Sequence, residues 1–341
     1  MRSLSRKTNN QIIATKDKLD NVNKNNILLK RDFLIYLKSI KRSEGTITGY
    51  DSDLNIVFVY ILDNLNNKDF AKLTKRELVG FQNWMIERDL SSNRIRRIKS
   101  AISSLSNYCE NILADDDPEF EGYRSSIRKI ENPPLQLVRE KTVWSDEELT
   151  TLLNTLIECK KYERACYVAL AMYSGRRKAE LARFKVSDFS DERLICDGAL
   201  YKSEPILTKG NKYLECYTLA KKFKPYLDMW MDKRSEDGID SIWLFPDRTD
   251  TSKHIKPSTF DGWSESFTKI AGKDFYPHSL RHYYCTALVK AGIPDNVIVD
   301  IIGWSSSEML KLYDDSSKDD KLDMYFSGGD IAVKTTPSFD F

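Results

Sequence analysis

Two arginines, a histidine, a tryptophan and a tyrosine in the second half of the chain could together act on a phosphate ester. Arg177 lies in the run Ser-Gly-Arg-Arg-Lys-Ala-Glu-Leu, while His278 and Arg281 share the run Pro-His-Ser-Leu-Arg-His. Trp304 follows in Ile-Gly-Trp-Ser-Ser, and Tyr313 comes shortly after it. An arginine fork donates two hydrogen bonds to phosphate oxygens, and an indole N–H can only donate. A tyrosine can supply the nucleophile, so the set is suited to breaking a phosphodiester without a metal.

The role of each residue depends on this spacing. The chain holds 17 tyrosines, and Tyr313 is singled out as the nucleophile only by its distance from Trp304. A free phenol has a pKa of about 10 and needs clustered positive charge or a base to ionise at neutral pH. His278 suits a general base or a phosphate donor, because a neutral imidazole can do both. Glu180 follows Arg177 by one helical turn and is expected to orient it.

The order Arg, Lys, His-x-x-Arg, Trp, Tyr resembles the active site of the tyrosine recombinases, which include phage integrases and Xer-type enzymes. The resemblance covers the C-terminal half closely and residues 27–112 more loosely. It implies that Arg177, Arg281 and Trp304 clamp a phosphorane-like transition state. It also implies that Tyr313 forms a 3′-phosphotyrosine link, which conserves the bond energy. No ATP, metal or other cofactor is therefore expected.

Two departures from the family pattern leave the catalytic groups in place. In the turn Thr-Lys-Gly-Asn-Lys-Tyr, Lys209 resembles the mobile hairpin lysine that protonates the departing 5′-oxygen, with Lys212 as the competing candidate. The Arg and Val-Pro-Leu that usually follow are replaced by Leu-Glu-Cys-Tyr-Thr-Leu. The residue before the first catalytic arginine is usually Leu and is Arg176 here. Counting the pattern Arg-x-x-Glu-Leu back from Glu180 selects Arg177 as the catalytic arginine.

Apolar periodicity predicts a mainly α protein with a small β-sheet and two domains. The four helices expected in the first domain are 27–40, 46–61, 75–88 and 91–112. Short strands are expected at 194–196, 199–207 and 213–218, and later helices at 219–232, 257–271, 279–291 and 294–301. The expected divisions are a disordered or weakly ordered polar arm at 1–26, a helical core-binding domain at 27–112, a linker at 113–142, a catalytic domain at 143–326 and a tail at 327–341. By resemblance the first domain is SAM-like, the second is an α+β catalytic domain, and the two form a C-shaped clamp on DNA.

Positive charge is concentrated in the first third of the chain, although the net charge is only +2. Residues 1–112 hold 20 Lys/Arg against 12 Asp/Glu, whereas the remainder holds 33 against 39. A basic segment suits contact with a phosphate backbone. In the fourth expected helix, four cations fall away from the apolar seam and are predicted to face DNA, the alternative being a solvated face: Arg94, Arg96, Arg97 and Lys99.

Several classes of protein are excluded by composition. No apolar run approaches the roughly 20 residues that cross a bilayer, and the polar start is not that of a signal peptide. The six cysteines show neither C-x-x-C pairing nor zinc spacing, which is typical of reduced thiols in the cytoplasm. The resemblance narrows this to a bacterial host cell, in association with the nucleoid.

The expected function is site-specific strand exchange by the integrase of a phage or other mobile element. The resemblance implies double-stranded DNA with specific sites as the partner and a homotetramer on paired sites, and it leaves room for an accessory excision or DNA-bending protein. The alternative is a non-catalytic DNA-binding regulator, such as a phage repressor, that retains the fold. A type IB topoisomerase shares the chemistry but not the first domain. Near the C-terminus, an apolar cluster is expected to dock on a neighbouring subunit or on its own: Leu322, Met324, Tyr325 and Phe326.

Overall fold

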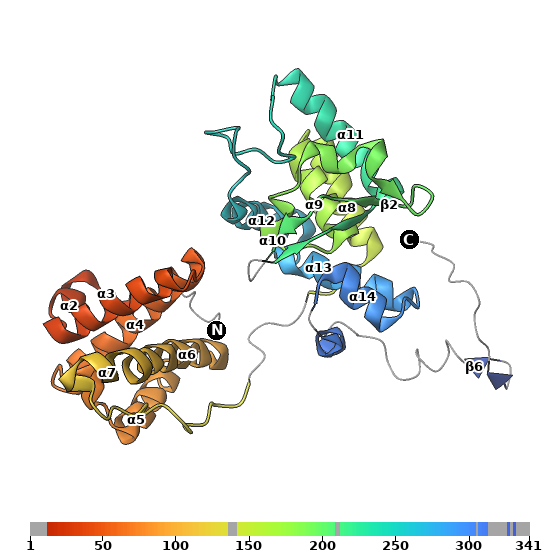
Figure 1. Cartoon of the computed structure of the whole chain (residues 1–341). Coiled ribbons are helices and arrows are strands. Elements are labelled where there is room, and N and C mark those ends of the chain that lie inside the picture. Colours follow the sequence, from red (N-terminus) through yellow and green to blue (C-terminus); the bar gives the residue numbers. More distant parts are fainter. Residues whose placement is uncertain are drawn as a thin grey trace. The chain divides into compact units, whose positions relative to one another are not determined.

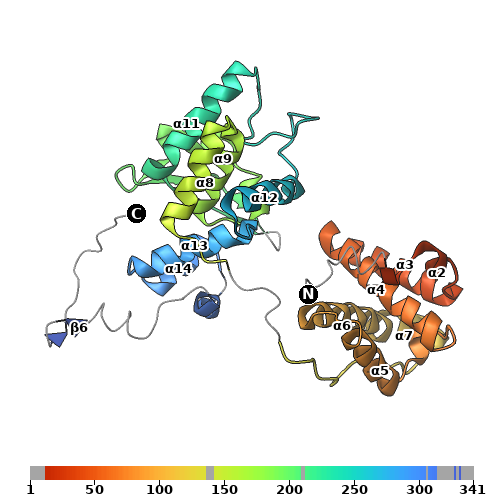
Figure 2. The same ribbon diagram turned by 180° about the vertical axis from the view of Figure 1, so that it is seen from behind.

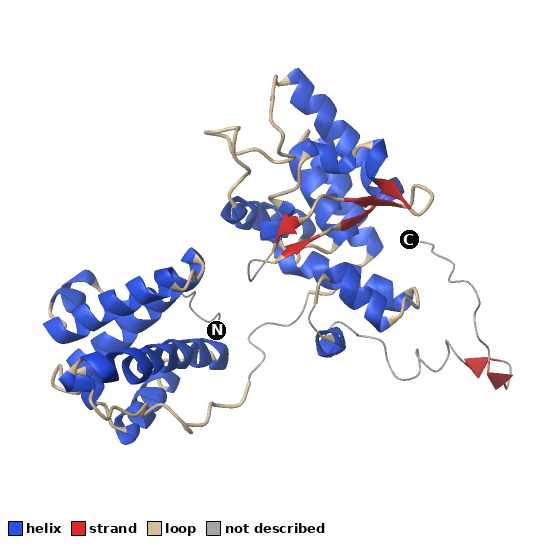
Figure 3. Cartoon of the chain, viewed as in Figure 1, coloured by secondary structure: helices blue, strands red, loops and turns tan. Residues whose placement is uncertain are grey.

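The computed structural model describes residues 12–135, 142–208, 212–304, 306–312, 326–327 and 330–331. The chain divides into two compact units, Met1–Glu140 and Lys141–Phe341. Both consist mainly of helices, and the strands of the described residues all lie in the second unit (Figures 1 and 3). Each unit has a hydrophobic core of its own. The prediction of a mainly helical, two-domain fold with a small sheet is therefore confirmed.

The N-terminal unit is a helical bundle in which α4 packs against three other helices. Its helices are α2 (Lys16–Asp20), α3 (Lys24–Ser39), α4 (Glu44–Asn64), α5 (Lys75–Ile86), α6 (Ser92–Tyr108) and α7 (Ala114–Asp116). Side-chain caps define the starts: Ser43 caps α4, and Thr74 with Glu77 forms a capping box on α5. Helix α4 contacts α2, α3 and α6, and Leu54, Phe58 and Ile61 on it are fully buried.

This unit extends beyond residues 27–112 in both directions. Part of the segment predicted as a polar arm forms α2, which an ion pair between Lys18 and Asp63 joins to α4. On the other side, Phe120 and Ile127 are buried in the same core. Residues 1–11 lie outside the described part of the chain. The predicted arm and linker thus contribute apolar side chains whose burial depends on contacts distant in sequence.

The C-terminal unit is organised around α9 (Tyr162–Ser174), whose residues are almost all buried. Three further helices pack against it: α8 (Asp146–Glu158), α11 (Ala220–Glu236) and α13 (Pro277–Lys290) (Figure 2). Helix α12 (Pro257–Ala271) packs on α8, and the rings of Tyr167 and Phe260 stack with centroids 4.1 Å apart. Helix α14 (Asp295–Ile302) and a 3-10 turn at Ser307–Leu312 form a smaller cluster with α13. The buried helix α9 thereby carries the loop that begins the candidate site.

Short antiparallel strands form the small sheets. Strands β1 (Leu194–Ile195), β2 (Leu200–Lys202) and β5 (Tyr217–Leu219) pair in the order β1-β2-β5. Strands β3 (Ile206–Leu207) and β4 (Tyr213–Leu214) form a separate hairpin, with Ile206 opposite Leu214. The single strand expected at 199–207 is divided because Pro205 has no N–H to donate to a ladder. Strands β6 (Phe326–Ser327) and β7 (Asp330–Ile331) also pair, whereas the other residues of the C-terminal apolar cluster lie outside the described residues.

Candidate active site

Arg177 is placed by the sharp end of α9. Gly175 ends that helix with φ +60°, and a Cβ at this position would lie 2.3 Å from the Tyr284 ring, so only glycine fits. Arg177 then starts the four-residue helix α10 (Lys178–Leu181), and its Nη1 lies 3.0 Å from Oε1 of Glu180. The other oxygen of Glu180 accepts a hydrogen bond from the Arg177 backbone N–H. Glu180 is 1% exposed and Arg177 33%, so a buried carboxylate fixes a half-exposed guanidinium, in keeping with the predicted orienting role.

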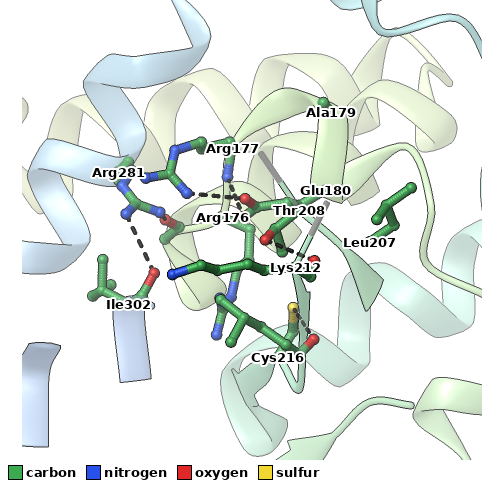
Figure 4. A network of polar contacts seen from close by, with 12 residues as sticks. Arg176, Arg177, Ala179, Glu180, Leu207, Thr208, Lys212, Cys216, Arg281 and Ile302 are labelled. Carbon is green, nitrogen blue, oxygen red and sulfur yellow. Dashed lines mark hydrogen bonds and ion pairs between the residues drawn. The ribbon is translucent and has the colours of Figure 1, made fainter. Parts of the chain in front are cut away.

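Arg281 joins three separate segments. It is 1% exposed, on α13, and its Nη1 donates to the Gly175 carbonyl at 2.9 Å. Its Nη2 donates to the Ile302 carbonyl at 3.3 Å, at the end of α14. The guanidinium carbon lies 5.3 Å from the ring centre of Trp304, which is within the range of a cation–π contact. Figure 4 shows the Arg177 and Arg281 side chains extending toward the same region from α10 and α13.

His278 lies one helical turn before Arg281 on α13 and is half-buried. Burial lowers the pKa of His278 below its ordinary value, and the positive charges of Arg281, Arg177 and His282 lower it further. The imidazole is therefore neutral at neutral pH, the form that can accept a proton.

Trp304 follows a tight turn at the end of α14. Gly303 ends that helix with φ +72°, and a Cβ there would lie 2.5 Å from the Leu214 side chain on β4. The backbone N–H of Trp304 donates to the Val299 carbonyl at 3.0 Å, which holds the residue beside the helix end. The Gly-Trp pair singled out in the sequence thus places an indole next to Arg281.

The hairpin lysines are described in part. Lys209 lies outside the described residues, but Thr208 and Lys212 on either side of the turn are joined by a bond from the Thr208 N–H to the Lys212 carbonyl at 2.7 Å. In Figure 4 the Lys212 side chain points toward Arg281 and the Ile302 carbonyl. Tyr313 also lies outside the described residues and directly follows the 3-10 turn Ser307–Leu312. Among the predicted catalytic residues that are described, the structure brings together Arg177, His278, Arg281 and Trp304.

The four basic residues of α6 do not share one open face. Arg94 is buried and forms an ion pair with the fully buried Asp53. Lys99 is also buried, and its Nζ donates to Gln82 and to the carbonyls of Ile130 and Glu131. Two of the four predicted DNA contacts therefore lie inside the unit. The sequence signal that was missed is Asp53, which directly precedes the apolar stretch Leu-Asn-Ile-Val-Phe-Val-Tyr, since a buried acid requires a partner.

Arg96 and Arg97 are more exposed members of this set. Arg96 donates to the Pro133 carbonyl at 2.9 Å. Arg97 pairs with Asp53 at 3.0 Å, and its guanidinium carbon lies 4.7 Å from the ring centre of Tyr50. Both side chains keep part of their surface in water.

Within the described ranges, no group of three or more His, Cys, Asp or Glu side chains is placed to hold a metal ion. In the same residues, no helix combines the length and the apolar character needed to cross a membrane. The candidate site is instead built from arginine, imidazole and indole donors, which suit an anionic substrate.

Comparisons with known proteins show the family of the chain. Residues 143–320 match the model of the phage integrase family, and residues 31–110 match that of the phage integrase N-terminal SAM-like domain. The SPbeta prophage-derived recombinase-like protein YomM of Bacillus subtilis is 29% identical over 72% of this chain and 74% of its own. A tyrosine recombinase of Thermosipho africanus is 24% identical over 85% of this chain and 96% of its own.

Solved structures share the fold. XerH site-specific recombinase bound to a palindromic difH substrate superimposes with a TM-score of 0.61 at 18% identity, covering 81% of this chain and 78% of its own. A lambda integrase dimer bound to a core site gives a TM-score of 0.61 at 15% identity, covering 84% and 76%. The matched family model spans more than half of the chain, and the chain belongs to the phage integrase family of tyrosine-type site-specific recombinases, which act on DNA.

Proposed function

We propose that this chain cleaves and rejoins duplex DNA at specific sites through a covalent link to Tyr313. The hydroxyl oxygen of Tyr313 attacks phosphorus, and the phenol proton passes to a base, for which His278 is suited. The bond between phosphorus and the 5′-oxygen breaks, and a hairpin lysine gives that oxygen a proton. The product is a 3′-phosphotyrosine and a free 5′-hydroxyl. Attack by the 5′-hydroxyl of a second strand reverses these steps and releases the tyrosine.

The observation that carries this proposal is the convergence of two guanidinium groups and a neutral imidazole. Figure 4 shows the Arg177 and Arg281 side chains extending toward the same region, and His278 lies one helical turn before Arg281. Burial and these two cations lower the pKa of His278. An anionic phosphorane is the substrate that benefits most from such a clamp, because preorganised donors stabilise charge that develops in the transition state. Trp304 beside Arg281 adds a donor that never accepts.

The leaving group requires a lysine that the hairpin can supply from two positions. We propose Lys209 as the acid, following the family pattern, and Lys212 remains the competing candidate. The orientation of Lys212 in Figure 4 supports a place for the hairpin over the arginines. A substrate with sulfur in place of the 5′-oxygen should restore the activity of whichever variant lacks the acid, Lys209→Ala or Lys212→Ala, because a thiolate leaves without a proton.

We further propose that the protein acts as a homotetramer on paired sites in a bacterial cytoplasm, moving a phage or other mobile element. Lambda integrase has been solved as a tetramer bound to a Holliday junction, which supports this assembly. The apolar residues near the C-terminus would dock on the neighbouring subunit in such a tetramer. An accessory excision or DNA-bending protein is proposed on the family pattern alone.

The test is covalent trapping on a nicked site. DNA bound by the protein is selected from a random pool, nicked next to the candidate cleavage position, and incubated with the full chain. We expect a protein–DNA adduct on a denaturing gel, none with Tyr313→Phe, and DNA affinity within about threefold of the parent, because the phenol oxygen contributes little to binding. Tyr325→Phe serves as the control that keeps the adduct. Specific binding without any adduct would support the non-catalytic regulator instead.

A further inference from the structure

Two adjacent arginines in the chain have opposite environments. Arg177 is 33% exposed and faces the candidate site, whereas Arg176 is 1% exposed and is among the largest fully buried side chains. The family usually has an apolar leucine where Arg176 stands. A buried guanidinium costs free energy unless its charge and its donors are satisfied. The placement of Arg176 therefore requires a structural reason.

The Nη2 atom of Arg176 bridges two segments of the site. It donates to the Glu215 carbonyl at 3.1 Å, between β4 and β5, and to the Ile301 carbonyl in the last turn of α14. The C-terminal carbonyls of a helix carry partial negative charge, which favours a cation there. The adjacent carbonyl, that of Ile302, accepts from Arg281. Two arginines from different segments thus bind neighbouring carbonyls at the end of one helix.

The same place is a close packing contact between the hairpin and the Gly-Trp turn. The position that a Cβ on Gly303 would occupy lies 2.5 Å from Leu214 and 3.7 Å from Nη1 of Arg176. Leu214 belongs to β4, which continues from the lysine turn, and Gly303 precedes Trp304. Within the described residues, Nε and Nη1 of Arg176 are buried without a hydrogen-bond partner, so its attachment depends on the Nη2 bridge.

We infer that Arg176 is a positioning residue that couples the lysine hairpin to the end of α14. By joining the Glu215 and Ile301 carbonyls, it fixes strand β4, which directly follows Lys212, relative to Trp304 and Arg281. It is too deeply buried to touch DNA, so it acts only through these neighbours. The inference rests on the proposed function for its catalytic consequence, but the physical coupling can be measured without any reaction.

The catalytic test uses oxygen and sulfur substrates. In Arg176→Leu, which restores the residue usual in the family, we expect adduct formation on an ordinary nicked site to slow by about a hundredfold, because a shift of about 1 Å in a catalytic group can cost that much. On a substrate with a 5′-bridging sulfur the loss should be at most about fivefold, because no acid is needed. DNA affinity should stay within about threefold. Lys221→Leu, which removes an exposed cation from α11, is the charge-matched control and should match the parent on both substrates.

Arg176→Lys is a second variant that disturbs folding less than Arg176→Leu, because it keeps the buried charge. Its single amine can no longer bridge both carbonyls in the same geometry. The ratio of its rate on the sulfur substrate to its rate on the oxygen substrate should lie between the ratios of the parent and of Arg176→Leu. Equal losses on both substrates, or none on either, would overturn the inference.

Hydrogen exchange separates failure of the coupling from failure of the proposed function. In Arg176→Lys, amides of 212–219 and 299–304 should exchange at least about tenfold faster, while those of α8 and α9 should not change. This result would stand even if the parent formed no adduct at all. Unchanged exchange in both segments would show that Arg176 does not hold them together.

Discussion

The chain buries arginines in two ways, against a carboxylate in the N-terminal unit and against main-chain carbonyls in the C-terminal unit. In the N-terminal unit, Arg94 pairs with the buried carboxylate of Asp53, which also pairs with Arg97. In the C-terminal unit, the bonds from Arg176 and Arg281 go to main-chain carbonyls. A carbonyl satisfies the N–H groups but carries no formal charge, so these bonds leave the guanidinium positive. Of these two arginines, Arg281 acts with burial and Arg177 to lower the pKa of His278, whereas Arg176 is too deeply buried to reach a phosphate.

The largest expected effect comes from removing the positive charge of Arg281. Arg281→Ala should slow covalent attachment to a nicked site by about a hundred- to a thousandfold, as removal of one preorganised donor typically does. Lys224→Ala, which breaks an exposed pair with Asp228, is the matched control and should change the rate less than twofold. The measurement is the single-turnover rate of adduct formation at saturating protein. Equal rates for the two variants would mean that Arg281 serves only the fold.

Breaking the ion pair between Arg94 and Asp53 should affect the stability of the N-terminal unit rather than the rate of DNA cleavage. Asp53→Asn leaves the buried Arg94 without its counter-charge, which should destabilise the N-terminal unit by about 3–5 kcal/mol. Hydrogen exchange of the α4 and α6 amides in the full chain reports this unit separately. The control is Asp63→Asn, because its pair with Lys18 is partly exposed and worth only about 0–1 kcal/mol. A loss for Asp53→Asn no larger than for Asp63→Asn would contradict the assigned role of the buried pair.

The sequence indicates which candidate site residues lie together more readily than it indicates which cations of α6 are buried, for a physical reason. His278 and Arg281 are separated by one helical turn, so a local repeat places them together. The burial of Arg94 depends on Asp53 from another helix, and that of Arg176 on carbonyls of the hairpin and α14. Adjacent arginines such as 176 and 177 look alike in sequence, and only contacts between distant segments distinguish them.

The extent of the N-terminal unit was harder to predict for the same reason. Residues 12–26 and 113–135 are typical of a polar arm and a linker, because their apolar side chains are few and follow no clear period. Val22 and Phe120 are nevertheless buried against the bundle. Isolated apolar residues of this kind gain their burial only once the surrounding helices have assembled.

Burial and the nearby positive charges lower the pKa of His278, and this shift predicts how the rate depends on pH. A base must be neutral to act, so the rate should be retained as the pH falls below the ordinary histidine value of about 6.5 and decline only at the lowered pKa. Arg177→Ala removes one positive neighbour, so the pKa of His278 should rise and the acid limb should move to higher pH. His254→Gln, which changes a histidine beside Trp243, should leave the profile in place. An acid limb that does not move in Arg177→Ala would show that His278 is not the base.

The lowered pKa of His278 also predicts how the stability of the C-terminal unit depends on pH. A histidine whose pKa is lower in the folded chain contributes stability that is present above the unfolded pKa and is lost as the pH falls through the folded pKa. His278→Gln should remove this acid-side decline. The thermal midpoint of the parent and the variant, compared across this pH range, measures it.

The smallest expected effect concerns the more exposed arginines of α6 and whether this helix contacts DNA. Arg96 and Arg97 keep part of their surface in water, whereas Arg94 and Lys99 are engaged inside the unit. Exchanging the half-buried Arg96 and Arg97 for glutamine should weaken binding to all sequences. It should also reduce the slope of log affinity against log salt by about 1 for each phosphate that the variant no longer neutralises.

A charge-matched control separates this effect from a general change in net charge. Arg31→Gln with Lys72→Gln removes two cations that pair with acids on the surface, and it should leave the slope nearly unchanged. Lys99→Gln should lower stability without altering the slope, since its amine is bound to Gln82 and two carbonyls. If the Arg96 and Arg97 pair gives the same slope as the control pair, this face of α6 is solvated and the phosphate contacts lie elsewhere. A reduced slope would place these two half-buried cations on the DNA backbone and leave the buried ones as part of the fold.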